Sequence, residues 1–369
     1  MTSTTEGAAT ATAGSAAPVA RAARHARRRA AAWTGALTVA LLASMAITVG
    51  IGPVPIAPGT VVQVVLDHLF GLPASVTQTP ADDAIVWNVR VPRVLLGVGV
   101  GAGLAMCGAA LQAMTRNALA DPYVLGISGG ASTGAAGAIL FGLGAGFGAY
   151  ALPASAFVGA LAASLLVFFI ARSGGGVTSL RLLLSGVAVG YALSAATSFL
   201  IFASDSAEGS RSVMFWLLGS LALARWDAVL AIVLVVVVAT FALLLVSGRN
   251  LDAIAAGDET AHTLGVSPDR ARVGLLVLVS LCTGAVVAAA GAIGFVGLVI
   301  PHLARRLVGS VHARMLPVTA LLGSLFLVWA DALARTIMQP RELPIGILTA
   351  LVGAPFLLIL VRRMYARHR

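Results

Sequence analysis

Few side chains in this chain of 369 residues could take part in ionic chemistry, and most of them lie at the ends of apolar runs. Arg90 and Arg93 open one such run, while Asp331 lies well inside another, with Arg335 one helical turn further on. A carboxylate and an arginine inside an apolar segment form a candidate functional pair, because charge is costly in a lipid environment. Mutual neutralisation of Asp331 and Arg335 is the alternative interpretation.

Other reactive groups are sparse. All 24 basic residues are arginine, so the chain lacks the lysine of a Walker A nucleotide-binding loop. Any step driven by ATP would need a partner that binds ATP and Mg²⁺. The six histidines show no metal-ligand spacing, and no nucleophile–base pair is visible. Cys107 and Cys282 both lie in apolar runs and are expected to be buried thiols without a disulfide. The sequence therefore predicts neither an enzyme nor a resident metal or cofactor.

Composition predicts the elements that must position these groups. Hydrophobic residues make up 59% of the chain and charged residues only 10%, and the mean hydropathy is +0.97. Such values are typical of a polytopic membrane protein. Apolar runs of about 20 residues recur without strand-like alternation, so the spanning elements are expected to be helices. The 41 glycines fit close helix packing in lipid.

The hydropathy pattern predicts an all-α membrane protein with about ten transmembrane helices. Residues 1–32 are rich in Ala, Thr and Ser and end in an arginine cluster, which predicts a disordered cytoplasmic tail. A loop is expected over 53–89. The predicted spans are 33–52, 90–113, 123–144, 150–171, 179–203, 227–247, 273–292, 294–308, 315–336 and 344–361.

The distribution of arginine predicts the orientation. If the N-terminus is cytoplasmic, 18 of the 24 arginines fall in cytoplasmic segments, as the positive-inside rule expects. Both termini are then cytoplasmic and the number of spans is even. Spans two to five and seven to ten also look related, and an offset of five spans makes such repeats inverted, a common transporter architecture.

Three blocks of sequence resemble the FecCD-type permeases, the membrane subunits of type II ABC importers for iron–siderophores, haem and cobalamin. The first block comprises Arg90-Val91-Pro92-Arg93, Gln112, Arg116-Asn117-Ala118-Leu119-Ala120-Asp121-Pro122 and Leu125-Gly126. The second runs from Gly294 to Gly309, and the third joins Ala330–Arg335 to Glu342–Gly346 and Gly353–Phe356. Ala118, where the family usually has Pro, and Val311, where Asp is common, are departures in cytoplasmic turns. The blocks are spread over roughly 90–360, and the resemblance implies one permease domain over residues 33–369.

The resemblance implies a coupling segment over 249–272 that docks on an ABC ATPase. The family pattern Gly-x-x-x-Ala-x-x-Leu-Gly is met from Gly257 to Gly265, where the second glycine is expected to adopt a positive φ. An ordinary connecting loop is the alternative. The residues assigned to coupling are Gly257, Asp258, Glu259, Ala261, Leu264 and Gly265.

The same resemblance places Arg90, Arg93 and Arg335 on the extracytoplasmic face, where they would meet glutamates of a substrate-binding protein as exposed charge pairs. Interfacial anchoring of helix ends is the alternative.

Four residues would form a cytoplasmic gate by the same resemblance. They are Asn117, Leu119, Thr178 and Ser179. Turn formation by Asn and helix capping by Ser or Thr are the alternative roles.

The function implied is transport without catalysis, in a multi-pass protein of the bacterial plasma membrane. The expected partners are ABC ATPase subunits, an extracytoplasmic binding protein and a second permease, either an identical copy or a paralogue. Ferric siderophore is the expected cargo, with haem or cobalamin as alternatives and no role for nucleic acid. A secondary, ion-coupled transporter would need several midplane carboxylates, and the sequence offers only Asp331.

Overall fold

The computed structural model describes residues 7–71, 79–173 and 178–366, and every regular element in these ranges is a helix. The first half contains α1 (Gly7–Gly50), α2 (Pro58–Phe70), α3 (Pro80–Ala84), the π-helix η1 (Ile85–Arg90), α4 (Val91–Thr115), the 3-10 helix η2 (Pro122–Leu125), α5 (Ile127–Phe141), η3 (Ala145–Tyr150), α6 (Ala151–Arg172) and α7 (Ser179–Phe202). The second half contains α8 (Ala207–Leu217), α9 (Ala228–Val246), α10 (Gly248–Ala256), α11 (Asp258–Thr263), α12 (Pro268–Ala290), α13 (Val296–Val308), α14 (His312–Ala334) and α15 (Ile345–Ala366).

Each of the ten predicted spans coincides with a helix, namely α1, α4, α5, α6, α7, α9, α12, α13, α14 and α15. Within the described residues, seven helices are long and apolar enough to cross a membrane, and α5 and α15 contribute shorter apolar stretches. The α5 and α13 helices are short because each follows an elbow. Gly126 has φ +72° before α5, and Gly291 has φ +70° in the non-helical stretch before α13.

Two sequence-based expectations about the N-terminal region are wrong. Residues 1–32 are expected to be disordered, yet residues 7–32 belong to α1, a continuous helix from Gly7 to Gly50, while residues 1–6 lie outside the described ranges. Alanine and arginine are among the strongest helix formers, which explains the extension. The expected loop over 53–89 instead contains α2, α3 and η1. Thr79 caps α3 through a reciprocal capping box with Asp82, a local signal that the sequence contains.

The core centres on α4, which is buried along most of its length. Gly101 lies against Gly323 of α14 and Gly108 lies against Gly297 of α13, so closely that a Cβ at either α4 position would collide with the facing backbone. Small residues thus bring helix backbones together, as expected in lipid. Cys107 and Cys282, on α4 and α12, are buried free thiols, as the sequence predicts.

Packing between the two halves of the chain is reciprocal. The α4 helix packs on α13 and α14, while α12 packs on α5 and α6. The elbows also meet, because the Ile293 backbone N–H donates to the Tyr123 hydroxyl at 2.8 Å. Two structural repeats would give these contacts if the first helix of each repeat, α4 or α12, packed against the later helices of the other repeat.

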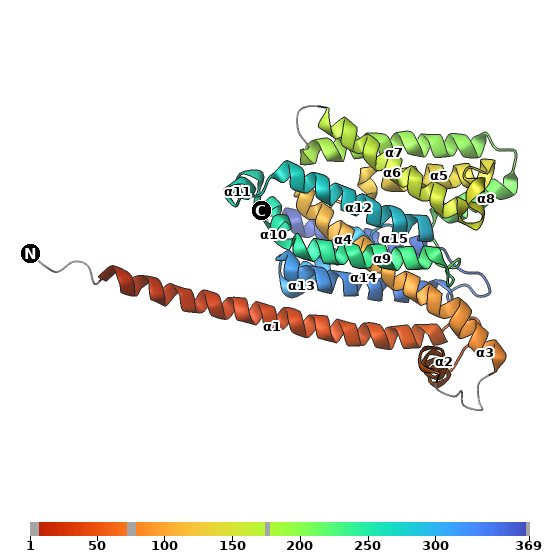
Figure 1. Cartoon of the computed structure of the whole chain (residues 1–369), viewed down its shortest axis with the longest axis horizontal. Helices are drawn as coiled ribbons and strands as arrows, with labels where there is room; N and C mark the ends of the chain where they lie inside the picture. Colours follow the sequence, from red (N-terminus) through yellow and green to blue (C-terminus); the bar gives the residue numbers. More distant parts are fainter. Residues whose placement is uncertain (1–6, 72–78, 174–177, 367–369) are drawn as a thin grey trace, which may run out of the picture.

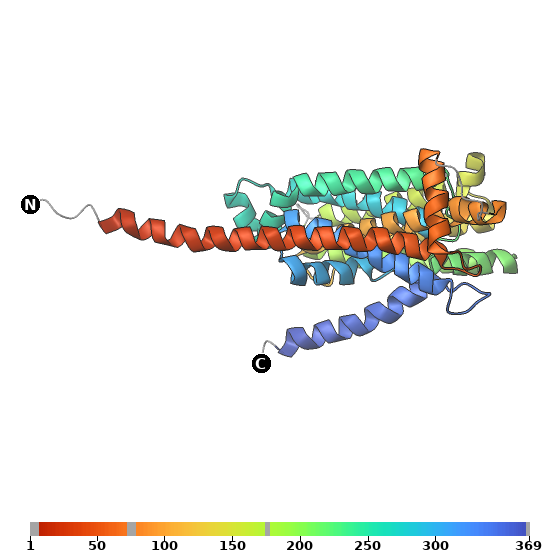
Figure 2. The same ribbon diagram turned by 90° about the horizontal axis from the view of Figure 1, so that it is seen from below.

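The bundle has two distinct ends. In Figure 1, α10, α11 and the end of α15 lie toward one end of the long axis and the start of α1 projects beyond it, while α2, α3 and α8 lie toward the other end. We call these the α10–α11 end and the α2–α3 end. Figure 2 shows that α15 leans away from the rest of the bundle toward its C-terminal end.

Candidate functional site

The predicted coupling segment forms two short helices, α10 and α11, at the α10–α11 end (Figure 1). The segment ends earlier than expected, because residues 268–272 form the first turn of α12, opened by Pro268. Gly257 has φ +125° between α10 and α11, and Gly265 has φ +77° after α11. The positive φ expected for Gly265 is thereby confirmed. No atom lies within 4 Å of a Cβ built at Gly265, so its backbone conformation alone favours glycine there.

Asp258 attaches α11 to the bundle. Its carboxylate accepts two hydrogen bonds from Arg272 of α12, at 2.6 and 3.1 Å. The Arg272 side chain is only 2% exposed and also reaches the Met114 carbonyl at the end of α4, at 3.5 Å. The hydrogen bond from Arg272 holds the pKa of Asp258 below its usual value. One buried guanidinium therefore joins α11 to α12 and to the end of α4.

The remaining coupling candidates divide into exposed and buried positions. Glu259 is exposed and Leu264 is 65% exposed, whereas Ala261 is buried beneath α11. An exposed leucine beside a glycine turn is available to a partner surface. The family pattern from Gly257 to Gly265 predicts the segment but not which of its residues are buried, since it does not distinguish the inward-facing Ala261 from its exposed neighbours.

A second polar clamp, absent from the sequence-based predictions, fixes α10. Asp252 accepts a hydrogen bond from the His312 backbone N–H at 3.0 Å and contacts His312 Nδ1 at 2.5 Å. His312 opens α14, so α10 is bound to α14 as α11 is bound to α12. The two residues are 60 positions apart, and only a contact prediction could have paired them.

The four proposed gate residues lie near the C-terminal end of α4. The Asn117 side chain accepts a hydrogen bond from the Leu119 N–H at 2.9 Å, and Thr178 caps α7 by accepting from the Arg181 N–H. Ser179 donates to the Met114 carbonyl at 3.2 Å, which joins the start of α7 to the end of α4. The capping roles expected as alternatives are present, although Arg116, with φ 51°, takes the left-handed conformation expected of Asn117.

At the α2–α3 end, the three arginines expected to be exposed are buried, and that expectation is wrong. Arg90, Arg93 and Arg335 are 5%, 6% and 3% exposed, respectively. Arg93 bonds Asp331 at 2.9–3.1 Å and forms two bonds with Glu342 at 3.0 and 2.8 Å. The burial has a physical cause: the chain supplies its own carboxylates to Arg93 and Arg335 and backbone carbonyls to Arg90.

Arg335 and Arg90 complete this network by bonding backbone carbonyls at the end of α1 and directly after it. Arg335 pairs with Asp331 at 3.1 Å and donates to the carbonyls of Thr48 and Ile51. Arg90 donates to the carbonyls of Val49, Gly50 and Val54. The predicted Asp331–Arg335 contact exists, but Asp331 bridges two arginines. Glu342, whose side chain is 38% exposed, completes the group and was not predicted as a member.

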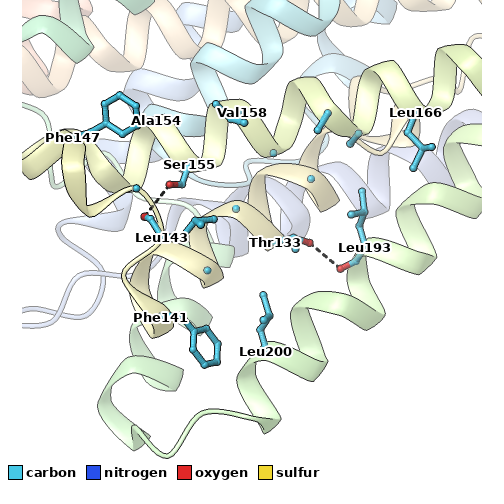
Figure 3. A pocket seen from close by; sticks show the side chains of 17 residues that line it. Thr133, Phe141, Leu143, Phe147, Ala154, Ser155, Val158, Leu166, Leu193 and Leu200 are labelled. Atoms are coloured by element: carbon cyan, nitrogen blue, oxygen red, sulfur yellow. Dashed lines mark hydrogen bonds between the residues drawn. The ribbon is translucent and has the colours of Figure 1, made fainter.

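A cleft of about 800 Å³ opens between α5, α6 and α7 (Figure 3). Glycines and apolar side chains line it, including Phe141, Val158 and Leu166. Its hydroxyls are bonded internally, since Ser155 donates to the Leu143 carbonyl and Thr133 donates to the Leu193 carbonyl, each at 3.1 Å. Within the described ranges, no group of three or more His, Cys, Asp or Glu side chains could hold a metal. The cleft thus offers shape and apolar surface without charge.

Together these features define a multi-pass helical membrane protein with a clamped pair of short helices at one end and a buried arginine network at the other. The sequence profile of the FecCD transport family matches residues 39–363, and the chain belongs to this family. The chain is 41% identical to the cobalamin import system permease protein of Halobacterium salinarum, over 92% of this chain and 98% of that protein. It is 40% identical to an Fe(3+)-citrate import system permease protein of Bacillus subtilis, over 76% and 82% of the two chains.

A solved structure of a metal-chelate type ABC transporter in an inward-facing conformation superposes with a TM-score of 0.77. That chain is 34% identical, and the match covers 89% of this chain and 98% of the other. The chain is therefore a permease subunit of an ABC importer, embedded in a membrane, and a transport component rather than an enzyme.

Proposed function

We propose that this permease passes a ferric siderophore from an extracytoplasmic binding protein across the bacterial plasma membrane. The observation that carries the proposal is the family match over 39–363, joined to relatives and a solved structure whose names refer to ferric citrate and metal chelates. Cobalamin is the second candidate, because the cobalamin permease relative matches 92% of this chain. Haem is a further alternative within the family.

The α10–α11 end is the proposed docking site for the ATPase, which supplies ATP and Mg²⁺. The exposed Leu264 and Glu259 would meet the ATPase, while the Asp258–Arg272 and Asp252–His312 clamps carry its movement into α12 and α14. Asn117, Leu119, Thr178 and Ser179 would narrow the pathway close to this segment, since Ser179 bonds the same Met114 carbonyl that Arg272 reaches. This end is then cytoplasmic, as the arginine distribution predicts.

The α2–α3 end is the proposed docking face for the binding protein. Because Arg90, Arg93 and Arg335 are buried, they would support docking by fixing the loops above them, and the partly exposed Glu342 marks where the network reaches the surface. A direct pair with the binding protein would require Arg93 to exchange its bonds with Glu342 for bonds with the partner.

A second permease copy is proposed to complete the pathway. One α10–α11 segment serves one ATPase, and ABC transporters use two. The α7 and α15 helices leave broad apolar faces uncovered, with Tyr191 77% and Leu358 67% exposed. The face of α7 also carries exposed small residues such as Ala188 and Ala195, which suit a close helix contact in lipid.

A secondary, ion-coupled mechanism is disfavoured by the state of Asp331. This carboxylate is 1% exposed and bonded to two arginines, so it offers no free oxygen pair to a proton or sodium ion. The apolar lining of the cleft in Figure 3 supports a wall that does not grip its cargo, which leaves selection to the binding protein.

Uptake by cells that lack their own permeases of this class tests both the mechanism and the cargo. The permease is expressed with its ATPase and binding protein, and radiolabelled ferric hydroxamate, cobalamin and haem are supplied separately. We expect ferric hydroxamate to accumulate, and only when the ATPase is active. Accumulation of cobalamin or haem alone would replace the proposed cargo, and uptake with an ATPase that cannot hydrolyse ATP would refute the importer mechanism.

A further inference from the structure

A polar pocket of about 600 Å³ lies beside the Asp252–His312 clamp that fixes α10, and the proposed coupling and gating roles do not account for its other polar side chains. Its walls come from the end of α4, the end of α10, the last turns of α13 and the start of α14. The lining side chains that carry charge or can form hydrogen bonds in the argument below are Gln112, Arg116, Asp252, His302, Arg305 and His312. The pocket is therefore at the α10–α11 end of the bundle.

The pocket gathers buried polar atoms that have no partner. Five buried side-chain nitrogen or oxygen atoms in the described residues lack a hydrogen bond, and three belong to residues that line this pocket: Gln112 Oε1, His302 Nδ1 and His312 Nε2. Gln112 and His312 are only 3% and 4% exposed. A buried polar atom without a partner is costly, so three such atoms in the residues around one cavity favour a polar ligand there.

The positive charge of Arg305 favours a bound anion over water as the occupant of the pocket. Arg305 is half-buried, and its guanidinium forms no hydrogen bond or ion pair with any residue that the structure describes. Arg116, on the α4 side, is 3.9 Å from Asp258. Asp252 is the one carboxylate that lines the pocket, and it is already bonded to His312. Water can satisfy the imidazole and amide atoms, but it leaves the Arg305 charge without a counter-ion.

The position of Arg305 at the end of a helix does not explain its burial. Arginines in the last turn of a helix are stabilised by the helix dipole wherever they point. Arg306 satisfies that preference with an exposed side chain, while its neighbour Arg305 lines the cavity. These two adjacent arginines thus form a matched pair, one inside the pocket and one outside.

We propose that this pocket binds an anion that carries a phosphate group and at least one hydroxyl. A guanidinium fork matches the oxygens of phosphate, and Arg305 and Arg116 would hold it from two sides. The hydroxyl is required because the free Gln112 oxygen can only accept a hydrogen bond. Soluble phosphate and the headgroup of an anionic phospholipid share this chemistry, and basic pockets between membrane helices bind such headgroups.

Binding would bear on coupling without depending on the cargo. Ala255 and Ala256 of α10 line the same pocket as Arg305 of α13, so a bound anion would contact both the coupling helix and α13. The inference rests on the pocket alone, and it stands or fails separately from the proposed siderophore transport.

The first test uses inorganic phosphate and the purified full-length permease. Binding is measured by the rise in unfolding temperature against chloride at equal ionic strength, for the wild-type protein, Arg305→Gln, Arg116→Gln and the control Arg306→Gln. We expect stabilisation of the wild type and Arg306→Gln, with affinity reduced about tenfold or more in Arg305→Gln, as loss of a charge-assisted hydrogen bond predicts. Equal unfolding temperatures of all variants in chloride show that the fold is intact.

The second test identifies a lipid source. The same variants are reconstituted in nanodiscs of phosphatidylcholine with or without phosphatidylglycerol, and retained lipid is measured by native mass spectrometry. Retention of phosphatidylglycerol by wild type and Arg306→Gln, but not by Arg305→Gln, supports a headgroup site, while a phosphate response alone supports a soluble ligand. If neither probe distinguishes Arg305→Gln from Arg306→Gln, the pocket is not a phosphate site and the inference is wrong.

Discussion

Replacing Asp331 by asparagine should destabilise the protein far more than neutralising Glu342, although both carboxylates bond Arg93. Asp331 and the two arginines that it bridges have side-chain exposures of 2%, 8% and 3%. Asparagine keeps the shape but removes the carboxylate charge that is bonded to both guanidinium groups. Breaking a buried ion pair from one side costs about 3–5 kcal/mol, because the remaining charge stays buried without compensation.

The structure narrows that range. Arg93 keeps its two bonds with Glu342, and Arg335 keeps the carbonyls of Thr48 and Ile51, so we expect about 3 kcal/mol for Asp331→Asn. Glu342 is 38% exposed, and Arg93 retains Asp331 when Glu342 is neutralised. Exposed pairs contribute about 0.2–1 kcal/mol, so Glu342→Gln should lie in that range.

Denaturant unfolding in detergent, followed by tryptophan fluorescence, can measure this difference. Trp329 lies two residues from Asp331 and donates to Ser44 on α1, so it reports on the same region. A double variant that combines Asp331→Asn with Arg335→Met should recover part of the lost stability, because it removes one uncompensated cation. Equal destabilisation by Asp331→Asn and Glu342→Gln, or no recovery in the double variant, would refute the electrostatic account.

Four further results are expected. Gly265→Val should impair ATPase stimulation while membrane expression holds, because valine disfavours the φ of +77°, whereas Gly265→Asn should be tolerated better; normal uptake by the valine variant would count against the turn. The double reversal Arg93→Glu with Arg335→Glu should reduce the yield of folded permease, since both side chains are buried; a folded variant that merely binds its partner less well would restore the exposed-pair interpretation. Asp258→Asn should make α11 more susceptible to proteolysis. In the unmodified protein the Asp258–Arg272 pair should hold at neutral pH and be lost only as the pH falls through the lowered pKa of Asp258, below the unfolded value of about 3.9. Loss of the protection of α11 against proteolysis already near pH 6 would contradict the pair. Copurification should yield one ATPase per permease, and a stable complex of one permease with two ATPases would exclude a second permease copy.

The sequence predicts the spanning helices well because each is an apolar run bounded by polar turns. Long apolar runs such as those of α9 and α12 predict both the type of element and its approximate bounds. The elbows before α5 and α13 are less visible, because a glycine with a positive φ interrupts a run whose composition does not change. The region over 53–89 reads as a loop because its short helices carry mixed side chains, and the capping box at Thr79 is the local signal for α3.

The contacts of the candidate site residues are harder to predict from the sequence than the segments that carry them. The arginines at the α2–α3 end lie together, but burial depends on where Asp331 and Glu342 fall in space, and these are separated from Arg93 by 238 and 249 positions. The Asp252–His312 and Asp258–Arg272 clamps similarly join groups on different elements. Local patterns predict which segments carry polar side chains, but not which side chains meet.

The glycine contacts along α4 imply how motion is divided within the molecule. Where Gly101 faces Gly323 and Gly108 faces Gly297, backbone meets backbone with no side chain that could change rotamer. Such seams cannot shift by small side-chain adjustments, so α4, α13 and α14 should travel as one rigid body. The helices with uncovered faces, α7 and α15, have no comparable constraint on those faces. Alternating access would then be a displacement of these two outer helices against a fixed frame, which distance measurements between spin labels on α7 and α14 could follow.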